Sequence, residues 1–496
     1  MTELNRAKQI APEGTNMALV NRSLVTIDDL SNGEMEALFS LADEMSDSMG
    51  KQLGLCRGKV MASLFFEPST RTRLSFETAI HRLGGSVVTA VDVKATSLAK
   101  GESIADMARV IGSYADIIVI RHPWEGAVKV VADYAGVPVI NAGDGGHQHP
   151  TQTLLDLYTI KKARQTIKGL KIALWGDLKY GRTVHSLMFA LAKLGADILF
   201  CPSPGLEVPQ HIIDKLVTEY GGELEKYDAA NSAVKKMPST LDAIYITPGS
   251  PHQLAMMPNL SLQVELEKGV DALYVTRPQK ERFAASKEGK ESEERYPVVD
   301  KKLLKEKEFK KTLIMHPLPR VDELAYELDT DPRSMYFKQA ALGVPVRMAL
   351  IASLLGVKEI SPAQEDSLPQ TDYPVYQREY GVRCPNPRCV SVQETEIKYL
   401  KPEFKIVKSR PLTLRCAYCE HGFEPKYIAS TEWHEGILAE KKYHSADSHW
   451  TRKIKPENLI IFDSESDAGA HGFKPSHYAK GEHETGDDRG KMSKEQ

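Results

Sequence analysis

Short apolar blocks and amphipathic blocks alternate along the first two thirds of the chain. The short blocks are typical of strands buried on both faces, and the amphipathic blocks are typical of helices that cover a sheet. The strand-like blocks of the first series are residues 59–66, 87–93, 117–120 and 137–141. This alternation predicts an α/β fold built on a parallel sheet.

A second series of the same kind starts at Leu170. It predicts a strand in KIALWGD, a helix at 184–194 and another strand in ADILFCP. We therefore expect two doubly wound parallel-sheet domains with an active site in the cleft between them. The residues from Gly176 to Gly181 match a dinucleotide-binding loop only weakly, which disfavours a nucleotide cofactor.

The stretch FFEPSTRTRLSFE, residues 65–77, places the end of a strand before a helix, because Pro68 has no N–H to donate. The apolar positions that can face a core in that helix are Leu74, Phe76, Ala79 and Ile80. The first helical turn has unpaired N–H groups and a partial positive charge, which favour a phosphate. Further donors come from Ser69, Thr70, Arg71 and Thr72. Taken alone, the string also fits an ordinary capped surface helix.

Length and charge narrow the class of protein. The chain has 496 residues, and its formal net charge of −3 gives no reason to expect nucleic acid or a membrane as the main partner. Its first residues lack a basic segment followed by an apolar one, and no apolar run approaches ~18 residues. We therefore expect a cytoplasmic protein.

Four of the six cysteines form two close pairs, Cys384 with Cys389 and Cys416 with Cys419. Two short-spaced pairs of thiolates suit tetrahedral zinc without an open position, which predicts one structural Zn²⁺. A redox pair and a zinc ribbon that binds nucleic acid are the alternatives. The acidic, proline-containing stretch SPAQEDSLPQTDYPV before the first pair is typical of a linker.

Several segments, in order, resemble the transcarbamoylase family, beginning with the STRT stretch, which is similar to its carbamoyl-phosphate site. The others are TSLAKGES with Lys100, RHP at 121–123, NAGDGGHQHPTQ at 141–152, GDLKYGRTVHS with Arg182, TRPQKER with Arg277 and Gln279, and HPLPRVDE at 316–323. Within the family, TRPQ and HPLP resemble the aspartate enzymes, whereas the ornithine enzymes usually carry a cysteine where this chain has Pro317. The resemblance covers roughly residues 20–357.

The resemblance implies transfer of the carbamoyl group of carbamoyl phosphate to the amino group of L-aspartate. The products would be N-carbamoyl-L-aspartate and phosphate, in an early step of de novo pyrimidine (UMP) synthesis without an organic cofactor. The implied carbamoyl-phosphate ligands are Ser69, Thr70, Arg71, Thr72, Arg121, His149, Gln152, Pro317, Leu318 and Pro319, with a cis Leu318–Pro319 bond. The implied L-aspartate ligands are Lys100, Arg182, Arg277 and Gln279. Catalysis would rest on Arg71, Thr72, Lys100, Arg121 and His149.

The family also implies moving and shared parts. Glu67 is expected to pair with Arg182 and Arg282 when the domains close. The loop of Lys100 is expected to enter a neighbouring subunit, which implies a homotrimer or a dimer of trimers. Family members commonly place a serine four residues before this lysine, where this chain has Thr96 followed by a serine, so either hydroxyl fits.

The histidine-containing loop has more than one interpretation. Asp144, His147 and His149 are spaced like metal ligands, and taken alone they fit metal binding, structural histidines or catalysis. The resemblance favours His149 as a donor to the carbonyl oxygen and leaves His147 without a role.

The segment from RCPNPRC to LRCAYCEHGF resembles the zinc domain of the regulatory chain of the aspartate enzyme. That chain has a nucleotide-binding domain before its zinc domain, and the short linker here cannot contain one. We therefore expect a zinc module that acts through quaternary contacts, without a response to CTP or ATP. A shift in aspartate saturation on adding either nucleotide would contradict this expectation.

The complete prediction is two α/β domains plus a small C-terminal zinc-binding β-rich domain. In chain order the parts are an N-terminal extension (1–20), a carbamoyl-phosphate domain (21–150), an aspartate domain (151–340), a helix returning to the first domain (341–359), a linker (360–376), the zinc domain (377–430) and a polar, partly disordered tail (431–496). A transcarbamoylase for another amine is a rival that the unaltered TRPQ and HPLP segments disfavour. An inactive scaffold is a second rival, disfavoured because the arginines and Lys100 of the motifs are all present.

Overall fold

The structure is a computed structural model. It describes residues 19–92, 97–164, 166–203, 205–221, 241–247, 269–277, 298–362, 371–378, 380–394, 400–431, 441–448 and 453–476, with only the backbone of Arg182 and Glu308. The chain divides into two compact units, a first unit (Met1–Gln370) and a second unit (Thr371–Gln496).

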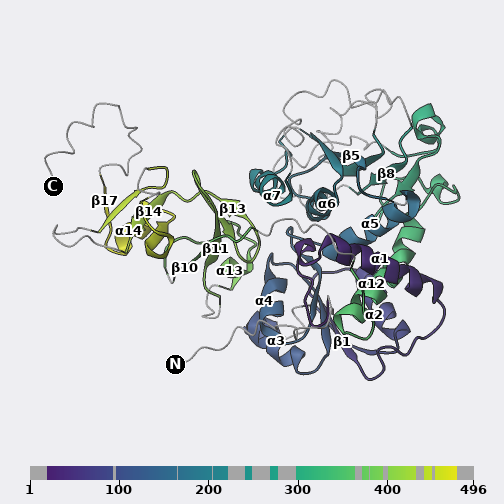
Figure 1. Ribbon diagram of the computed structural model, residues 1–496, viewed down its shortest axis with the longest axis horizontal. Coiled ribbons are helices and arrows are strands. Elements are labelled where there is room, and N and C mark those ends of the chain that lie inside the picture. The colour runs from purple at the N-terminus through teal and green to yellow at the C-terminus, as the bar shows by residue number, and fades with distance from the viewer. Residues whose placement is uncertain are drawn as a thin grey trace. The chain divides into compact units, whose positions relative to one another are not determined.

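The first half of the first unit is a parallel sheet with strand order β2-β1-β3-β4 (Figure 1). Its strands are β1 (Val60–Phe65), β2 (Ser86–Val91), β3 (Ile117–His122) and β4 (Val139–Asp144). Its helices are α1 (Asn32–Asp47), α2 (Thr70–Arg82), α3 (Ile104–Gly112) and α4 (Ala127–Tyr134). Strands β1, β3 and β4 are almost fully buried, which explains why their sequences are mostly apolar before the polar residues near the ends of β3 and β4.

The second half is another parallel sheet, with strand order β6-β5-β7-β8-β9. Its strands are β5 (Lys171–Gly176), β6 (Asp197–Pro202), β7 (Ala243–Thr247), β8 (Ala272–Val275) and β9 (Leu313–Met315). Its helices include α6 (Arg182–Lys193) and α7 (Gln210–Tyr220). Short 3-10 helices complete the first unit at Ile27–Asp29, Ser97–Lys100, Leu303–Lys305, Lys307–Phe309 and Tyr326–Leu328.

Two long helices join the halves. Helix α5 (Pro150–Arg164) contacts β4 in the first half and α6 in the second, and α12 (Tyr336–Leu354) packs against α1, α2 and α5 (Figure 1). The predicted returning helix, 341–359, corresponds to α12. One continuous apolar cluster therefore runs from α1 and α2 through both joining helices to β5 and α6.

The second unit contains two four-stranded sheets. The first is antiparallel, with strand order β10-β11-β12-β13, and comprises β10 (Val375–Gln377), β11 (Glu403–Ser409), β12 (Leu412–Cys416) and β13 (Gly422–Phe423). The second has strand order β16-β14-β15-β17 and comprises β14 (Tyr427–Ser430), β15 (Lys442–Ser445), β16 (Leu459–Phe462) and β17 (Lys474–Pro475). The helices of the second unit are α13 (Val390–Gln393), α14 (Glu465–Ala470) and a 3-10 helix at Pro456–Asn458. Strands β15 to β17 lie in the segment that the sequence analysis assigned to a polar tail.

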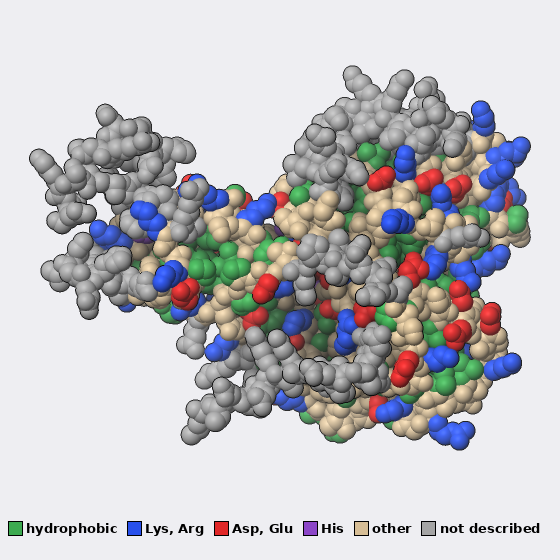
Figure 2. All heavy atoms as spheres, viewed as in Figure 1, with side chains coloured by type: hydrophobic (Ala, Val, Ile, Leu, Met, Phe, Trp, Pro, Cys, Tyr) green, Lys and Arg blue, Asp and Glu red, His purple; other side chains and the backbone are tan. Residues whose placement is uncertain are grey.

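Two parallel sheets and a β-rich second unit confirm the predicted fold class. One detail of the prediction was wrong: in α2, Phe76, Ala79 and Ile80 are buried, but Leu74 is 48% exposed. Leu74 precedes Phe76 by two residues, which places it on the other side of the helix. On the face shown in Figure 2, basic and acidic side chains are interspersed, in agreement with the small net charge.

Candidate active site

The junction of β1 and α2 places the predicted phosphate ligands at the start of a helix. Helix α2 begins at Thr70, and Ser69 occupies the N-cap position with a hydroxyl that makes no capping hydrogen bond. Thr72 is buried, whereas Thr70 and Arg71 are exposed. A cavity of about 390 Å³ lies beside this turn, lined by Phe65, Phe66, Pro68, Ser69, Thr70, Arg73, Val91 and Asp92. The helix start therefore has both the donors and the space for an anion.

Arg71 lies within electrostatic reach of a second cation from the other half of the unit. Partial burial of its guanidinium lowers the pKa of Arg71, although the residue is exposed overall, and the positive charge of Arg277, just after β8, lowers it further. A predicted phosphate ligand and a predicted aspartate ligand are thus within electrostatic reach of each other. An anion bound between them would relieve this repulsion.

Arg121 and His149 meet at Gly143. A Cβ atom at Gly143 would lie 3.1 Å from Arg121 Nη1 and 3.4 Å from His149 Cδ2, and the residue has a φ of +115°. Both the close approach and the backbone conformation therefore call for glycine here. Both side chains are buried, so this corner of the site is preorganised.

Glu67 pairs with Arg121 in this structure. Arg121 Nη2 donates to Glu67 Oε1 at 2.7 Å, and Nη1 donates to the carbonyl oxygen of Ala142 at 3.3 Å. The sequence analysis expected Glu67 to pair with Arg182 and Arg282 on closure. The Arg182 side chain and Arg282 lie outside the described residues, so this expectation stays a prediction.

The start of α5 carries two of the predicted carbamoyl ligands. The backbone N–H of His149 donates to Ser186 Oγ at 3.0 Å, and its Nδ1 lies 3.4 Å from Thr151 Oγ1. Gln152, in the first turn, donates from Nε2 to Asp156 Oδ1 at 2.8 Å. Both ligands are therefore held by groups outside the set that the sequence analysis predicted.

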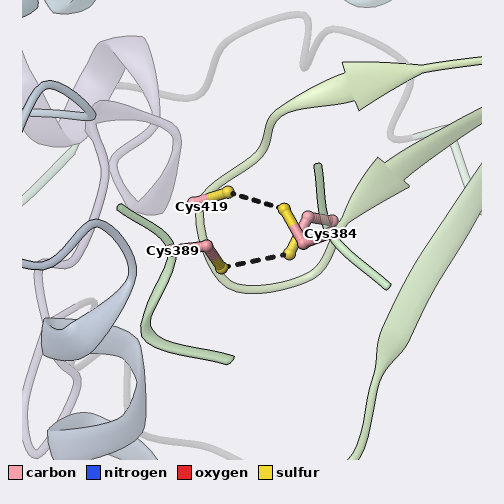
Figure 3. A group of neighbouring side chains, drawn as sticks. Cys384, Cys389 and Cys419 are labelled. Atoms are coloured by element: carbon pink, nitrogen blue, oxygen red, sulfur yellow. Dashed lines mark hydrogen bonds between the residues drawn. The ribbon is translucent and has the colours of Figure 1, made fainter. Parts of the chain in front are cut away.

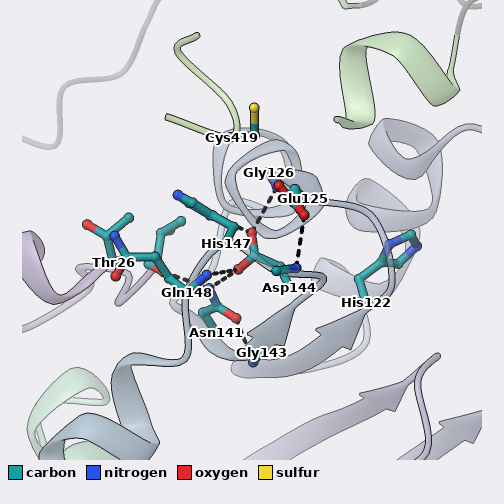
Figure 4. Close-up of polar contacts among 12 residues, drawn as sticks. Thr26, His122, Glu125, Gly126, Asn141, Gly143, Asp144, His147, Gln148 and Cys419 are labelled. Carbon is teal, nitrogen blue, oxygen red and sulfur yellow. Dashed lines mark hydrogen bonds and ion pairs between the residues drawn. The ribbon is translucent and has the colours of Figure 1, made fainter. Parts of the chain in front are cut away.

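Asp144 organises the loop before α5 (Figure 4). Its Oδ2 accepts hydrogen bonds from the backbone N–H of Gly126 and lies 2.8 Å from His147 Nδ1, while Oδ1 accepts from Asn141 Nδ2 and from the backbone N–H of Gln148. With both carboxylate oxygens engaged in this way, the Asp144–His147 pair has a structural explanation. This favours the structural interpretation of His147 over metal binding.

The 316–323 loop is closed by a buried pair of its own residues. The Leu318–Pro319 bond is cis, as the resemblance implied, and Leu318 has a φ of +53°. The Leu318 N–H donates to His316 Nδ1 at 2.8 Å, so the ring must donate from Nε2, which lies 2.8 Å from Glu323 Oε1. Burial alone would raise the pKa of Glu323, but the hydrogen bond with His316 and those from backbone N–H groups outweigh it and leave the pKa below its ordinary value. These contacts fix the backbone around Pro317.

The other predicted ligands are placed in part. Lys100 is exposed at the end of the 3-10 helix Ser97–Lys100. Thr96 and Gln279 lie outside the described residues, as does the side chain of Arg182. The structure thus brings Arg121 and His149 together at Gly143, and the substrate-binding roles of all these residues stay predictions.

The four paired cysteines converge in the second unit. Their sulfur atoms all lie within 4.8 Å of one another, and all four side chains are buried. Cys384 Sγ is 3.6 Å from Cys419 Sγ, and Cys389 Sγ is 3.8 Å from Cys416 Sγ (Figure 3). Four sulfurs at the Zn–S distance of about 2.3 Å in a tetrahedron would be about 3.8 Å apart, whereas a disulfide needs about 2.05 Å. The residues therefore fit one zinc ion, and no other group of potential ligands occurs in the described part of the chain.

Comparison with protein families gives the same division of the chain. The carbamoyl-phosphate-binding domain of aspartate/ornithine carbamoyltransferases matches residues 22–162, and the aspartate/ornithine-binding domain matches residues 252–354. An aspartate carbamoyltransferase catalytic subunit of Thermoplasma acidophilum is 45% identical over 340 residues, which are 68% of this chain and 99% of the relative. The chain belongs to the aspartate/ornithine carbamoyltransferase family. A catalytic subunit from Clostridium botulinum is 44% identical over 341 residues, 68% of this chain and 100% of the relative.

Solved structures and the C-terminal region extend this result. The catalytic subunit of Methanocaldococcus jannaschii aspartate transcarbamoylase has a TM-score of 0.54 at 42% identity, over 68% of this chain and 98% of that one. The Trypanosoma cruzi enzyme in complex with carbamoyl phosphate and aspartate has a TM-score of 0.53 at 34% identity, over 68% of this chain and 98% of that one. Residues 378–429 match the metal-binding domain of the aspartate carbamoyltransferase regulatory chain. The predicted carbamoyltransferase and its zinc module are therefore confirmed.

Some residues that build the site were not found from the sequence. Glu323 lies within HPLPRVDE, and its spacing from His316 was the available signal. The side chains of Ser186, Asp156 and Gln339 sit on helices, and no local pattern marks them.

Among the described residues, no helix is long and apolar enough to cross a membrane.

Proposed function

We propose that the chain catalyses carbamoylation of L-aspartate in pyrimidine synthesis with the residues named below. The amine nitrogen of aspartate attacks the carbamoyl carbon, the C–N bond forms, the C–O bond to phosphate breaks, and the amine proton leaves with the phosphate. The observation that carries the proposal is the start of α2, which places Ser69 and Thr70 beside a cavity of about 390 Å³, with Arg277 within electrostatic reach of Arg71.

The phosphate is assigned to Ser69, Thr70, Arg71 and Thr72. The helix start supplies backbone donors and partial positive charge, and the guanidinium of Arg71 supplies a full charge. The repulsion between Arg71 and Arg277 supports this assignment, because an anion bound near both guanidinium groups would relieve it.

The carbonyl oxygen is assigned to Thr72, Arg121 and His149. Negative charge develops on this oxygen in the transition state, and buried, preorganised donors lower its energy most effectively. The burial of Arg121 and His149 around Gly143 supports the assignment. Gln152 and the backbone of Pro317, Leu318 and Pro319 would hold the rest of the carbamoyl group.

The two carboxylates of aspartate are assigned to Lys100, Arg182, Arg277 and Gln279. Aspartate is named in the Trypanosoma cruzi complex, and the TRPQ segment of this chain fits an acidic acceptor. Lys100 is exposed, which is compatible with a side chain that completes the site of a neighbouring subunit. We propose a homotrimer or a dimer of trimers on this ground.

The zinc ion is proposed to stabilise the second unit and take no part in the reaction. Four cysteine ligands leave no open position for a substrate. Thiolates that hold zinc must stay reduced, which supports a cytoplasmic location.

The direct test is an assay of the purified full chain for N-carbamoyl-L-aspartate and phosphate. Arg71→Ala is expected to lower the rate by about 100- to 1000-fold, since one preorganised donor at developing charge is worth that much. Arg109→Ala is the matched control, because Arg109 is an exposed arginine paired with Asp106 on α3 and should leave the rate unchanged. Equal rates in both variants would refute the phosphate assignment.

A further inference from the structure

Asp156 is a buried carboxylate where the two joining helices meet the second sheet. Its Oδ1 accepts three hydrogen bonds: from Gln152 Nε2 at 2.8 Å, from Gln339 Nε2 at 2.9 Å and from the hydroxyl of Tyr274 at 3.0 Å. These donors come from α5, α12 and β8. One oxygen thus joins α5, α12 and β8 through hydrogen bonds.

The geometry determines which way the Gln152 amide points. An acceptor such as the Asp156 oxygen requires the NH₂ group of the glutamine, so Nε2 must face Asp156. The carbonyl oxygen, Oε1, then faces away from Asp156. This oxygen can accept a hydrogen bond from an NH₂ group, which is the group that distinguishes carbamoyl phosphate from phosphate.

A second path of hydrogen bonds links Asp156 to the 316–323 loop. Gln339 donates to Asp156 through Nε2 and accepts through Oε1 from the backbone N–H of His316 at 3.1 Å. His316 in turn accepts from the N–H of Leu318. The same carboxylate is therefore linked to both groups that are assigned to the carbamoyl end of the substrate.

We propose that Asp156 is a positioning residue that orients Gln152 and, through Gln339, the 316–323 loop for the carbamoyl group. It does not touch the substrate, and it acts on affinity for the carbamoyl group rather than for the phosphate. This inference rests on the proposed function of Gln152 and the loop. Within the described residues, the other ionisable groups that act on Asp156 are Arg347 and the tyrosines Tyr245 and Tyr274.

The test compares binding of two ligands to the full chain by calorimetry. Inorganic phosphate probes the α2 site alone, and carbamoyl phosphate probes both ends. Asp156→Leu, which has a similar shape but no acceptor, is expected to weaken carbamoyl phosphate about 5- to 10-fold and to leave phosphate unchanged. Asp156→Asn keeps one acceptor oxygen and should restore most of the affinity.

Asp43→Leu is the matched control. Asp43 accepts a hydrogen bond from Tyr158, also on α5, at 2.5 Å. The Asp43→Leu variant therefore loses a carboxylate contact to the same helix without affecting Gln152. Equal weakening of both ligands by Asp156→Leu would show a merely structural role and overturn the proposal. If Asp156→Leu does not fold, Gln339→Leu takes its place. It should weaken carbamoyl phosphate about threefold and leave phosphate unchanged, and unchanged affinities for both ligands would also overturn the proposal.

The outcome also separates this inference from the proposed function. Wild-type protein that does not bind carbamoyl phosphate would contradict the proposed function itself. A second outcome would contradict only the role of Asp156: the wild type binds carbamoyl phosphate and forms product, and the Asp156→Leu variant has the same affinity.

Discussion

The first and second units reach a stable fold by different physical routes. The first unit has a continuous apolar cluster that runs through both of its sheets and both joining helices. Among the described residues of the second unit, a smaller apolar cluster contains Ala429, Tyr443, Ile460, Phe462, Ala468 and Phe473, and the four cysteines form a separate buried group. From this contrast we expect burial to stabilise the first unit, and a bound metal to supply much of the stability of the second unit.

The largest effect is expected from loss of the metal. Structural zinc contributes about 10 to 16 kcal/mol of apparent binding free energy, so chelation or Cys416→Ser should unfold the first sheet of the second unit. Hydrogen exchange should rise across β11 and β12 and stay slow in α12 of the first unit. Cys201→Ser, at a buried cysteine outside the cluster, is the control. Fast hydrogen exchange in α12 after zinc removal would show that zinc also stabilises the first unit, which would contradict this account of the two units.

A cavity created by mutation in the core of the first unit should destabilise that unit and leave the zinc site of the second unit intact. Phe76 is fully buried, and the guanidinium of Arg347 lies 4.9 Å from its ring centroid. Phe76→Ala should cost about 3 to 5 kcal/mol of the free energy of unfolding of the first unit. Zinc content, measured by atomic absorption, should remain one ion per chain. Leu74→Ala is the control on the same helix, because that side chain is exposed and its loss should cost little.

An effect that depends on pH, and is at most similar in size, is expected from Asp156, a strongly shifted carboxylate among the described residues of the first unit. Burial raises the pKa of Asp156 from 3.8 to about 7, although hydrogen bonds from Gln152, Tyr274 and Gln339 oppose the rise. Between these pH values the folded state keeps a proton that the unfolded state has lost, so stability falls as pH rises, by up to ~1.4 kcal/mol per pH unit.

Asp156→Asn removes this titration and keeps an acceptor oxygen. Denaturant unfolding at a series of pH values should therefore show the wild type losing stability relative to the variant from about pH 4 to about pH 7, with no further change above that range. A constant difference across the range would contradict the shifted pKa.

The sequence predicted those parts of the site that are contiguous in the chain. The helix start at Ser69 to Thr72 and the two cysteine pairs each carry their chemistry within a few residues. Spacing alone indicated the cysteine site, whereas the helix start needed the resemblance of several ordered motifs to be told from an ordinary cap. Asp156 and Gln339 are 183 residues apart and join only when α5 and α12 cross, which no local pattern encodes. The strands after residue 441 were missed for a related reason, since LIIF is their only continuous apolar run and β15 pairs through its backbone with β14 and β17.

The acceptor of the carbamoyl group provides the most direct test of the central claim. The kcat/KM of the full chain should be measured with carbamoyl phosphate and either L-aspartate or L-ornithine. A site lined by Arg277 and the other predicted cations should bind two carboxylates and reject a second amino group, so we expect aspartate to be preferred by at least about 100-fold. Comparable turnover of ornithine, or no turnover of aspartate, would contradict the account.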